Sequence, residues 1–226
     1  MEAIAVDFPL RGEWCAPNTP GYKVPSHGTD MLAQTYAYDL MQIDWRYPKG
    51  FRFFTKPYLS ALLFGVRLNE CLCWSQPIYA PFAGEVIEAE DGVKERDPVN
   101  FFRDLFLALK AGVNFKERPN HELKSVLGNY IILKGEQCHA FFAHGRIGSI
   151  GVKPGDHVVS GQQLAEVGHS GNSTAPHLHF QLMDGPSLMA ARGLPCCFRE
   201  YELFENGEWR KVRNGIPGRH DRIRVL

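Results

Sequence analysis

Two histidines separated by one residue are the feature of the sequence best suited to chemistry. They are His177 and His179, in the run 176–182, PHLHFQL. If this run is a β-strand, alternate side chains share a face, so His177, His179 and Gln181 point to the same side. Two imidazoles placed in this way can converge on one metal ion or on its bound water. Such pairs also occur as ordinary surface histidines, so further ligands are needed to favour a metal site.

A hydrolytic zinc site needs about three protein ligands and one open position for water. The candidates elsewhere are His27, Asp39 in the strand-like run 36–40, and His144 at the end of an apolar run. A lone histidine at a strand end is usually a hydrogen-bonded structural residue, so only the presence of all three favours a metal centre. Four further histidines are expected to be surface or structural residues: His139, His157, His169 and His220.

Short strands with glycine and proline turns must position these side chains. Residues 77–92 predict a strand, a turn and a strand, residues 128–143 repeat this pattern, and residues 150–183 continue it. Short strands at such spacing indicate an all-β sandwich or barrel. The predicted fold class is therefore mainly β, with an antiparallel sheet and helical insertions.

Two segments depart from the strand pattern and are expected to be insertions, at 49–74 and 97–127. The second begins with Asp97-Pro98, a typical helix start. Its large apolar residues follow at helical spacing and are expected to face the core: Phe101, Phe102, Leu105, Phe106 and Leu109. No linker divides the chain, which predicts a single domain over 1–226, with a core at about 24–185 and a C-terminal extension at 186–226.

The overall composition is that of a globular protein with a substantial core. Hydrophobic residues make up 44% of the 226 positions, and 25 basic residues balance 25 acidic ones. This balance does not favour nucleic acid as a partner, and no apolar run is long enough for a membrane span. The N-terminal residues do not have the pattern of a secretory signal, so the cytoplasm is the default expectation, and a secreted or cell-wall location the alternative if a signal has been removed.

The cysteines are not spaced like those of a disulfide-stapled module. They are Cys15, Cys71, Cys73, Cys138, Cys196 and Cys197. We expect mostly free thiols. The alternative is a second zinc site from the pairs 71/73 and 196/197, although structural zinc sites usually place paired cysteines farther apart in sequence.

Two longer stretches surround the histidines. They are residues 144–162, HGRIGSIGVKPGDHVVSGQ, and residues 167–180, VGHSGNSTAPHLHF. Together they resemble the lysostaphin/LytM family of zinc endopeptidases, and residues 77–92 and 128–130 also resemble its core strands. The resemblance implies a LytM-type β-sheet core and one Zn²⁺ per chain. It also implies that Asp39 and His179 are zinc ligands and that His144 and His177 are the catalytic histidines.

The first zinc ligand departs from the family pattern. The family commonly places a histidine four residues before the aspartate, where this chain has Thr35. The only histidine upstream of Asp39 is His27, and we expect it to complete the ligand set by looping back. Asp30 is a rival carboxylate ligand.

The resemblance implies an endopeptidase that hydrolyses peptide bonds, in bacterial cell-wall peptidoglycan or in glycine-rich peptides. In that mechanism His177 would take a proton from water or return it to the leaving amine, and His144 would share this role. One alternative is a non-catalytic binding module of the same architecture. Another is a phosphocarrier-like domain, which would use His144 and His177 but would not need Asp39 or His179 as ligands. The sequence does not indicate the oligomeric state.

Overall fold

The computed structural model describes residues 2–117 and 119–226, with all of their side chains except those of residues 49 and 111–122. The strands are β1 (Ile4–Val6), β2 (Gly12–Asn18), β3 (Tyr38–Met41), β4 (Pro77–Tyr79), β5 (Gly84–Glu90), β6 (Asn129–Lys134), β7 (His139–Gly145), β8 (His157–Val158), β9 (Gln163–Glu166), β10 (Leu178–Met183), β11 (Gly193–Leu194), β12 (Cys196–Glu205), β13 (Glu208–Gly215) and β14 (Ile223–Val225). The helices are α1 (Tyr58–Phe64), α2 (Phe101–Glu117) and α3 (Pro119–Leu127), with short 3-10 helices η1 (Met31–Tyr36), η2 (Pro48–Gly50) and η3 (Leu68–Glu70).

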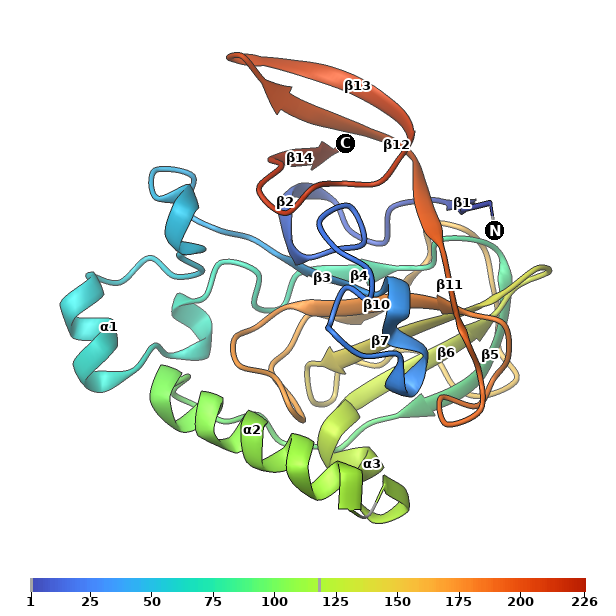
Figure 1. Cartoon of the computed structure of the whole chain (residues 1–226), viewed down its shortest axis with the longest axis horizontal. Helices are drawn as coiled ribbons and strands as arrows, with labels where there is room; N and C mark the ends of the chain where they lie inside the picture. The colour runs from blue at the N-terminus through green and yellow to red at the C-terminus, as the bar shows by residue number, and fades with distance from the viewer. Residues whose placement is uncertain (1, 118) are drawn as a thin grey trace.

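One large sheet organises the fold (Figure 1). In the described part of the chain it has 12 strands, in the order β1-β12-β14-β2-β3-β10-β7-β6-β5-β8, with β11 beside β10 and β13 beside β12. The pairings around its centre are antiparallel, and β1 runs parallel to β12. Strands β4 and β9 form a separate two-stranded sheet. The predicted mainly β, antiparallel fold class is confirmed.

Strand β10 lies at the centre of this sheet and is buried on both faces. Leu178, Phe180 and Leu182 pack into the main core, where Phe180 meets Phe142 with ring centroids 5.4 Å apart. His179, between them in sequence, points to the opposite face, as strand alternation requires. The period-2 pattern of β10 thus places apolar residues in the core and leaves the other face for polar groups.

The predicted strand segments form, but not all of them pair with their neighbours in sequence. Residues 128–143 give the antiparallel hairpin β6–β7. Residues 77–92 give β4 and β5, which pair with β9 and β6 respectively. The extension 186–226 supplies β11 to β14, and β14 joins the sheet beside β2.

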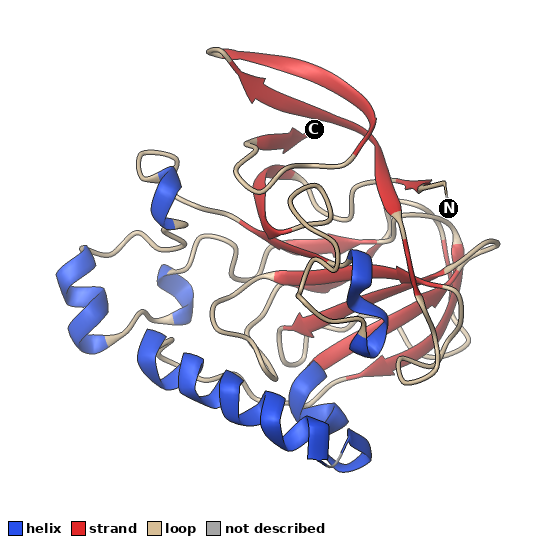
Figure 2. Ribbon diagram, viewed as in Figure 1, coloured by secondary structure: helices blue, strands red, loops and turns tan. Residues whose placement is uncertain are grey.

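Helices α1, α2 and α3 lie together at one side of the strands (Figure 2). The predicted start of the second insertion helix was wrong, because α2 begins at Phe101 and Asn100 accepts a hydrogen bond from the backbone N–H of Arg103. Asp97 instead accepts a hydrogen bond from the backbone N–H of Leu68, at 3.2 Å.

The prediction that the apolar stripe of α2 faces the core was also wrong. The five predicted core residues of this helix are between 41% and 66% exposed. Among residues 101–110 the buried side chain is Asp104, which forms ion pairs with Arg96 and Arg103 at 2.8 and 3.0 Å. The described part of α2 therefore contacts the domain through a charged group. None of the described helices is long and apolar enough to cross a membrane.

All six cysteines are buried free thiols, as expected. Burial is the largest effect on the thiol of Cys73 and raises its pKa to about 12. In the described residues the cysteines form no group of three or more metal ligands, so the alternative of a second, all-cysteine zinc site has no support in the structure.

Candidate metal centre and active site

Strand pairing brings the first two predicted ligands together. Asp39 on β3 is directly opposite His179 on β10 in the antiparallel ladder. Side chains of directly opposed residues project to the same face of a sheet. Nδ1 of His179 accordingly lies 3.0 Å from Oδ1 of Asp39.

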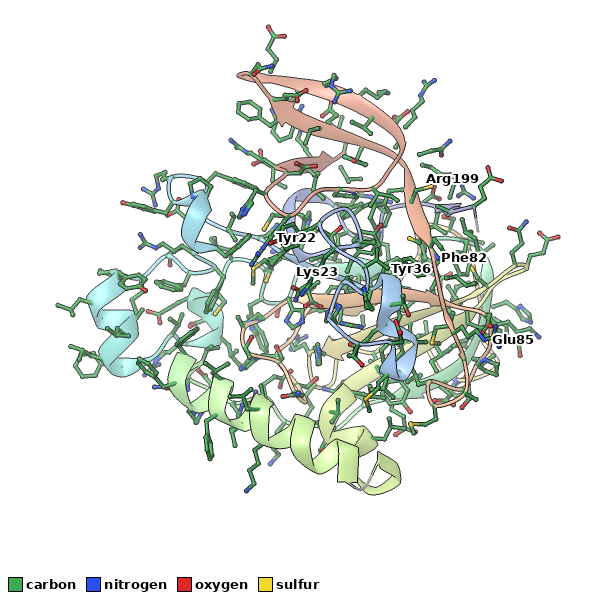
Figure 3. All side chains as sticks on the ribbon, in the orientation of Figure 1. Tyr22, Lys23, Tyr36, Phe82, Glu85 and Arg199 are labelled. Carbon is green, nitrogen blue, oxygen red and sulfur yellow. The ribbon has the colours of Figure 1, made fainter. Side chains whose placement is uncertain are left out.

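The loop before β3 brings in His27, whose Nε2 lies 3.0 Å from Oδ2 of Asp39. Ser26 holds this loop, because its backbone N–H donates to the carbonyl of Thr35 at 2.9 Å. The Ser26 hydroxyl lies 3.0 Å from Nδ1 of His27, which leaves Nε2 to face the carboxylate. Figure 3 labels Tyr22, Lys23 and Tyr36, which mark the course of this segment between β2 and β3.

Thr35 and Asp30 take no part in this cluster. The Thr35 hydroxyl donates to Oδ1 of Asp30 at 2.9 Å, and this pair is exposed. The group of metal-binding type among the described residues is His27, Asp39 and His179, whose ligand atoms all lie within 4.8 Å of one another. The geometry therefore favours His27 over Asp30 as the third ligand.

The two predicted catalytic histidines, His144 and His177, lie beside this cluster, with ring centroids 4.9 Å apart and ring planes tilted by 52°. Nδ1 of His177 is 2.7 Å from the carbonyl of Ala175, and Nδ1 of His144 is 2.9 Å from the carbonyl of Ser170. A carbonyl only accepts, so in each histidine Nδ1 donates, and Nε2 carries no proton in the neutral ring. Nε2 of His177 lies 3.4 Å from Oδ1 of Asp39.

His144 reaches this position through an unusual backbone conformation, with φ at +64°. A positive φ is uncommon for a residue with a side chain, and histidine is among those that adopt it more often. The conformation occurs near the end of β7 and turns the imidazole toward the site. Strain of this kind persists where the surrounding structure fixes it, and it is frequent at functional sites.

Burial and mutual charge shift the titration of this group. Burial alone would raise the pKa of Asp39, but His27 and His177 beside it hold that pKa well below its usual range. Burial lowers the pKa of His144, and the neighbouring His177 and His179 lower it further. Burial opposes protonation of His177, but Asp39 outweighs it and raises the pKa of His177.

Two further residues, Asn18 and Gln181, form hydrogen bonds that orient the candidate ligands Asp39 and His179. The amide Nδ2 of Asn18 donates to Oδ2 of Asp39 at 2.7 Å. Nε2 of His179 lies 3.0 Å from Oε1 of Gln181, whose Nε2 donates to the carbonyl of Leu32 at 2.7 Å. Gln181 was predicted to share a face with His179, but no local pattern in the sequence indicates Asn18, because the contact depends on the pairing of β2 with β3.

A pocket of about 590 Å³ opens over the cluster. Its floor includes the five predicted site residues, and its walls come from the loop before η1, from α3 and from the turn before β10. Gly28, Thr29, Asn172 and Thr174 line it with small or polar side chains. The site is therefore accessible to a ligand of peptide size.

The arrangement is unfavourable for a phosphocarrier. A phosphoryl group on Nε2 of His177 would bring its negative charge against the Asp39 carboxylate, which lies 3.4 Å from that nitrogen. Like charges at this distance repel each other. The same carboxylate is well placed to share a cation with His27 and His179.

Comparison of the sequence with known families gives a match over residues 107–190 to Peptidase family M23. The matched segment contains His144, His177 and His179, and it does not reach His27 or Asp39.

Several solved structures are distantly similar to the chain. A zinc-containing peptidase from Vibrio cholerae is 24% identical, with a TM-score of 0.30, over 48% of this chain and 23% of its own. A mutant of the catalytic domain of the prophage-encoded M23 protein EnpA from Enterococcus faecalis is 22% identical, with a TM-score of 0.35, over 54% of this chain and 67% of its own. The antimicrobial peptidase lysostaphin from Staphylococcus simulans is 24% identical, with a TM-score of 0.32, over 53% of this chain and 36% of its own. The matches thus span from about a quarter to two thirds of these chains, and the assignment rests on the sequence match. Residues 107–190 of this chain are thus similar to Peptidase family M23, in agreement with the resemblance that the sequence motifs indicated.

Proposed function

We propose that the chain is a zinc-dependent endopeptidase that hydrolyses peptide bonds of cell-wall or glycine-rich peptides. The observation that carries this proposal is the convergence of three imidazoles on one carboxylate. Asp39 lies within 3.4 Å of His27, His177 and His179, and a pocket gives access to them. This arrangement supplies three candidate ligands, together with a neighbouring imidazole that can accept a proton.

The residues present fit a zinc ion. Two imidazoles and one carboxylate are a usual donor set for zinc, with bonds of about 2.0–2.2 Å. Ligand atoms around a tetrahedral ion with such bonds lie roughly 3.3 Å apart. Nε2 of His27 lies 3.0 Å from Oδ2 of Asp39, and Nδ1 of His179 lies 3.0 Å from Oδ1, which is close to that value, and all three residues line the pocket.

His27, Asp39 and His179 would hold the metal. When bound, zinc lowers the pKa of water to about 7 and polarises a carbonyl group. His177 donates through Nδ1 to the carbonyl of Ala175, which leaves its Nε2 free to accept a proton from the attacking water and to return it to the leaving amine. His144, held in the same way by Ser170, presents a second Nε2 that can share this transfer or stabilise the oxyanion.

The pocket supports a peptide with small side chains as substrate. Gly28, Thr29, Asn172 and Thr174 are among its lining residues, together with apolar side chains such as Met31 and Leu32, and residues of the sheet also line it. A glycine-rich or peptidoglycan peptide would fit such a surface without large side-chain subsites. The resemblance of the sequence to lysostaphin-type enzymes suggests the same substrate class.

The test is a comparison of zinc content and peptide hydrolysis between single variants. His179→Ala should lose bound zinc and turnover together, whereas His177→Ala should keep about one zinc per chain and lose most turnover, since general acid–base catalysis contributes about 10²–10⁴-fold. Elemental analysis of protein purified without chelator measures the zinc content. Cleavage of glycine-rich peptides or peptidoglycan fragments measures the turnover.

His157→Ala is the matched control, since His157 is an exposed histidine on β8. It should match the wild type in both measurements. A wild-type chain that contains no zinc and takes up none on addition would rule out the metallopeptidase. Near-full turnover in His177→Ala would show that another group moves the proton.

A further inference from the structure

Ten large apolar side chains of α1 and α2 are exposed, and together they form what we call the α1–α2 patch. They are Tyr58, Leu59, Leu62, Leu63 and Phe64 of α1, and Phe101, Phe102, Leu105, Phe106 and Leu109 of α2. The five aromatic members are between 63% and 72% exposed. At about 150–250 Å² for each aromatic side chain, these five alone present roughly 500–800 Å². The largest apolar patch on a typical monomer measures about 300–600 Å² and often marks a binding site, so the α1–α2 patch points to a partner.

Backbone pairing brings the two helices together at their ends. Val66, two residues after α1, and Val99, two residues before α2, form an antiparallel bridge with N–H···O distances of 2.8 and 2.7 Å. Both valines are buried in a small core of their own, with Phe54, Leu68 and Cys71. The end of α1 therefore lies beside the start of α2, and Figure 1 shows the two helices next to each other at one corner of the molecule. The apolar side chains of both helices can contact the same partner.

The apolar residues of α2 form one stripe with cations along its border. At about 100° per residue, the stripe that ends at Phe106 covers roughly 140° of the helix surface. By the same spacing, Arg103 and Lys110 lie about 40–60° beyond Phe106. Both of these cations are exposed, whereas Asp104 is buried and faces the domain. The described part of α2 thus combines an apolar face with a basic edge.

The charged side chains that the described parts of these helices expose are all cationic. Helix α1 contains no acidic residue, and the acidic residue in the described part of α2 is the buried Asp104. Arg67, which follows α1, is exposed as well. Two acidic residues of the connecting segments, Glu70 and Asp97, accept hydrogen bonds from backbone N–H groups at 2.8 and 3.2 Å. A partner with negative charge around an apolar interior is therefore complementary to the α1–α2 patch.

We propose that the α1–α2 patch docks the chain on the surface of an anionic lipid bilayer, as a peripheral contact that does not cross it. Helices that lie in a membrane interface combine phenylalanine and leucine on one face with lysine and arginine beside it, and the apolar face enters by about 5–10 Å. Acyl chains accept apolar side chains without a matching groove. Lipid phosphates pair with Arg67, Arg103 and Lys110 at the level of the headgroups. This docking does not depend on the proposed peptidase function.

A second copy of the chain fits the α1–α2 patch less well than a lipid surface. A symmetric contact would place the exposed Arg103 and Lys110 of one protomer near the same cations of the other, and the described parts of α1 and α2 expose no acidic side chain to pair with them. A protein partner would find no recess for an anchoring side chain in the known cavities. The pocket over the histidines and the small cavity beside β6 include no residue of α1 or of the described part of α2.

The experiment is flotation of the full chain with vesicles of phosphatidylcholine, with and without phosphatidylglycerol. Binding should be stronger to the anionic vesicles and should fall as the salt concentration rises, because salt screens the attraction between the cations and the lipid phosphates. The combined change of Phe102→Ser and Phe106→Ser should weaken binding by about tenfold or more, since two large side chains no longer enter the bilayer. Arg67→Gln and Lys110→Gln should each weaken binding to the anionic vesicles by about fivefold.

Val159→Ser is the matched control, because Val159 is 67% exposed and follows β8, at the edge of the sheet. It should bind vesicles like the wild type, and urea unfolding checks that each variant is folded. Should a variant fail to fold, the lipid and salt dependence of the wild type decides the question alone.

Two results would overturn the proposal. Equal binding of the wild type to both kinds of vesicle, without dependence on salt, would exclude recognition of an anionic surface. A wild-type chain that binds neither kind of vesicle would exclude docking on lipid. Sedimentation would then show a dimer that the combined change dissociates if a second copy covers the patch, or a monomer if another protein does. Because every measurement is of binding, a failure here leaves the proposed peptidase untouched, and loss of zinc or turnover leaves the docking untouched.

Discussion

At the scale of single residues, the site depends on how each imidazole is held. An imidazole that binds a metal through one nitrogen needs its other nitrogen fixed, which sets the tautomer and the orientation of the ring. His27 is fixed by Ser26, and His179 by Gln181. Each ligand thus has a partner of its own that does not contact Asp39.

Substitution of Gln181 tests whether the residue that holds the second nitrogen of His179 contributes to zinc binding. Its Oε1 accepts from Nε2 of His179, so Gln181→Ala should lower zinc affinity by about 10- to 100-fold, as is usual for groups that orient a ligand. Competition against a chelator of known affinity measures the change. Gln181→Glu keeps an acceptor at this position and should retain more of the affinity than Gln181→Ala. An equal loss of zinc affinity in both variants would show that the hydrogen-bond acceptor at position 181 does not determine that affinity.

His27 and Asp30 can be separated as zinc ligands by substitution. The structure places Nε2 of His27 against Asp39 and pairs Asp30 with Thr35 at the surface. His27→Ala should therefore abolish stoichiometric zinc binding, and Asp30→Ala should leave it intact. Elemental analysis of both variants distinguishes them, and the reverse pattern would make Asp30 the ligand.

The sequence singles out five residues that the fold brings to one pocket, and their roles as ligands and catalytic residues stay a prediction. It could not predict Asn18, which meets Asp39 only because β2 pairs with β3. The contact of Asp104 with His169 joins an insertion helix to a turn far along the chain. Contacts of this kind have no local pattern and follow only from the assembled fold.

At the scale of elements, α2 shows why helical periodicity alone misled the prediction. Its apolar residues recur at the spacing of a core-facing stripe, but a stripe says only that one face is apolar, not that the domain covers it. In the structure the buried Asp104 pairs with Arg96, which lies outside the helix, and this contact turns Asp104 toward the domain while the predicted core residues stay exposed. A buried charge that loses its partners is more costly than an exposed apolar residue, so the charged contact prevails.

A comparison of two phenylalanines tests this orientation of α2. Phe106 is 66% exposed, whereas Phe142 in the main core is 2% exposed. Phe106→Ala should change the free energy of unfolding by less than about 0.5 kcal/mol, and Phe142→Ala should lower it by about 3–5 kcal/mol. Urea unfolding measures both. A similarly large loss of unfolding free energy in both variants would mean that the apolar face of α2 is buried in solution.

At the scale of the whole molecule, the extension at 186–226 completes the sheet that carries the site. Strand β14 lies between β12 and β2, and its Ile223 is opposite Trp14 and fully buried. Strand β2 in turn carries Asn18, which holds the zinc-ligand candidate Asp39. The sequence motifs end before this region, so the strand order that joins it to the site could not be predicted from them.

The buried carboxylate of Asp104 also links the stability of the whole fold to pH. Burial would raise the pKa of Asp104, but His169, Arg103, the backbone N–H of Asn100 and Arg96 hold it below its usual range. The folded chain therefore releases this proton at a lower pH than the unfolded chain, whose aspartates titrate near about 3.9. The ionised Asp104 therefore stabilises the folded chain fully above a pH of about 3.9. This stabilisation is lost as the pH falls through the pKa that Asp104 has in the folded chain.

Asp104→Asn should consequently lower the free energy of unfolding at neutral pH, and its difference from the wild type should stay constant down to about pH 4 and narrow as the pH falls further. Urea unfolding at several pH values measures this difference. Asp30→Asn, a change at an exposed aspartate with one side-chain partner, should follow the wild type throughout. A difference between Asp104→Asn and the wild type that stays constant with pH would show that Asp104 contributes through shape and packing, and that its charge does not hold α2 against the domain.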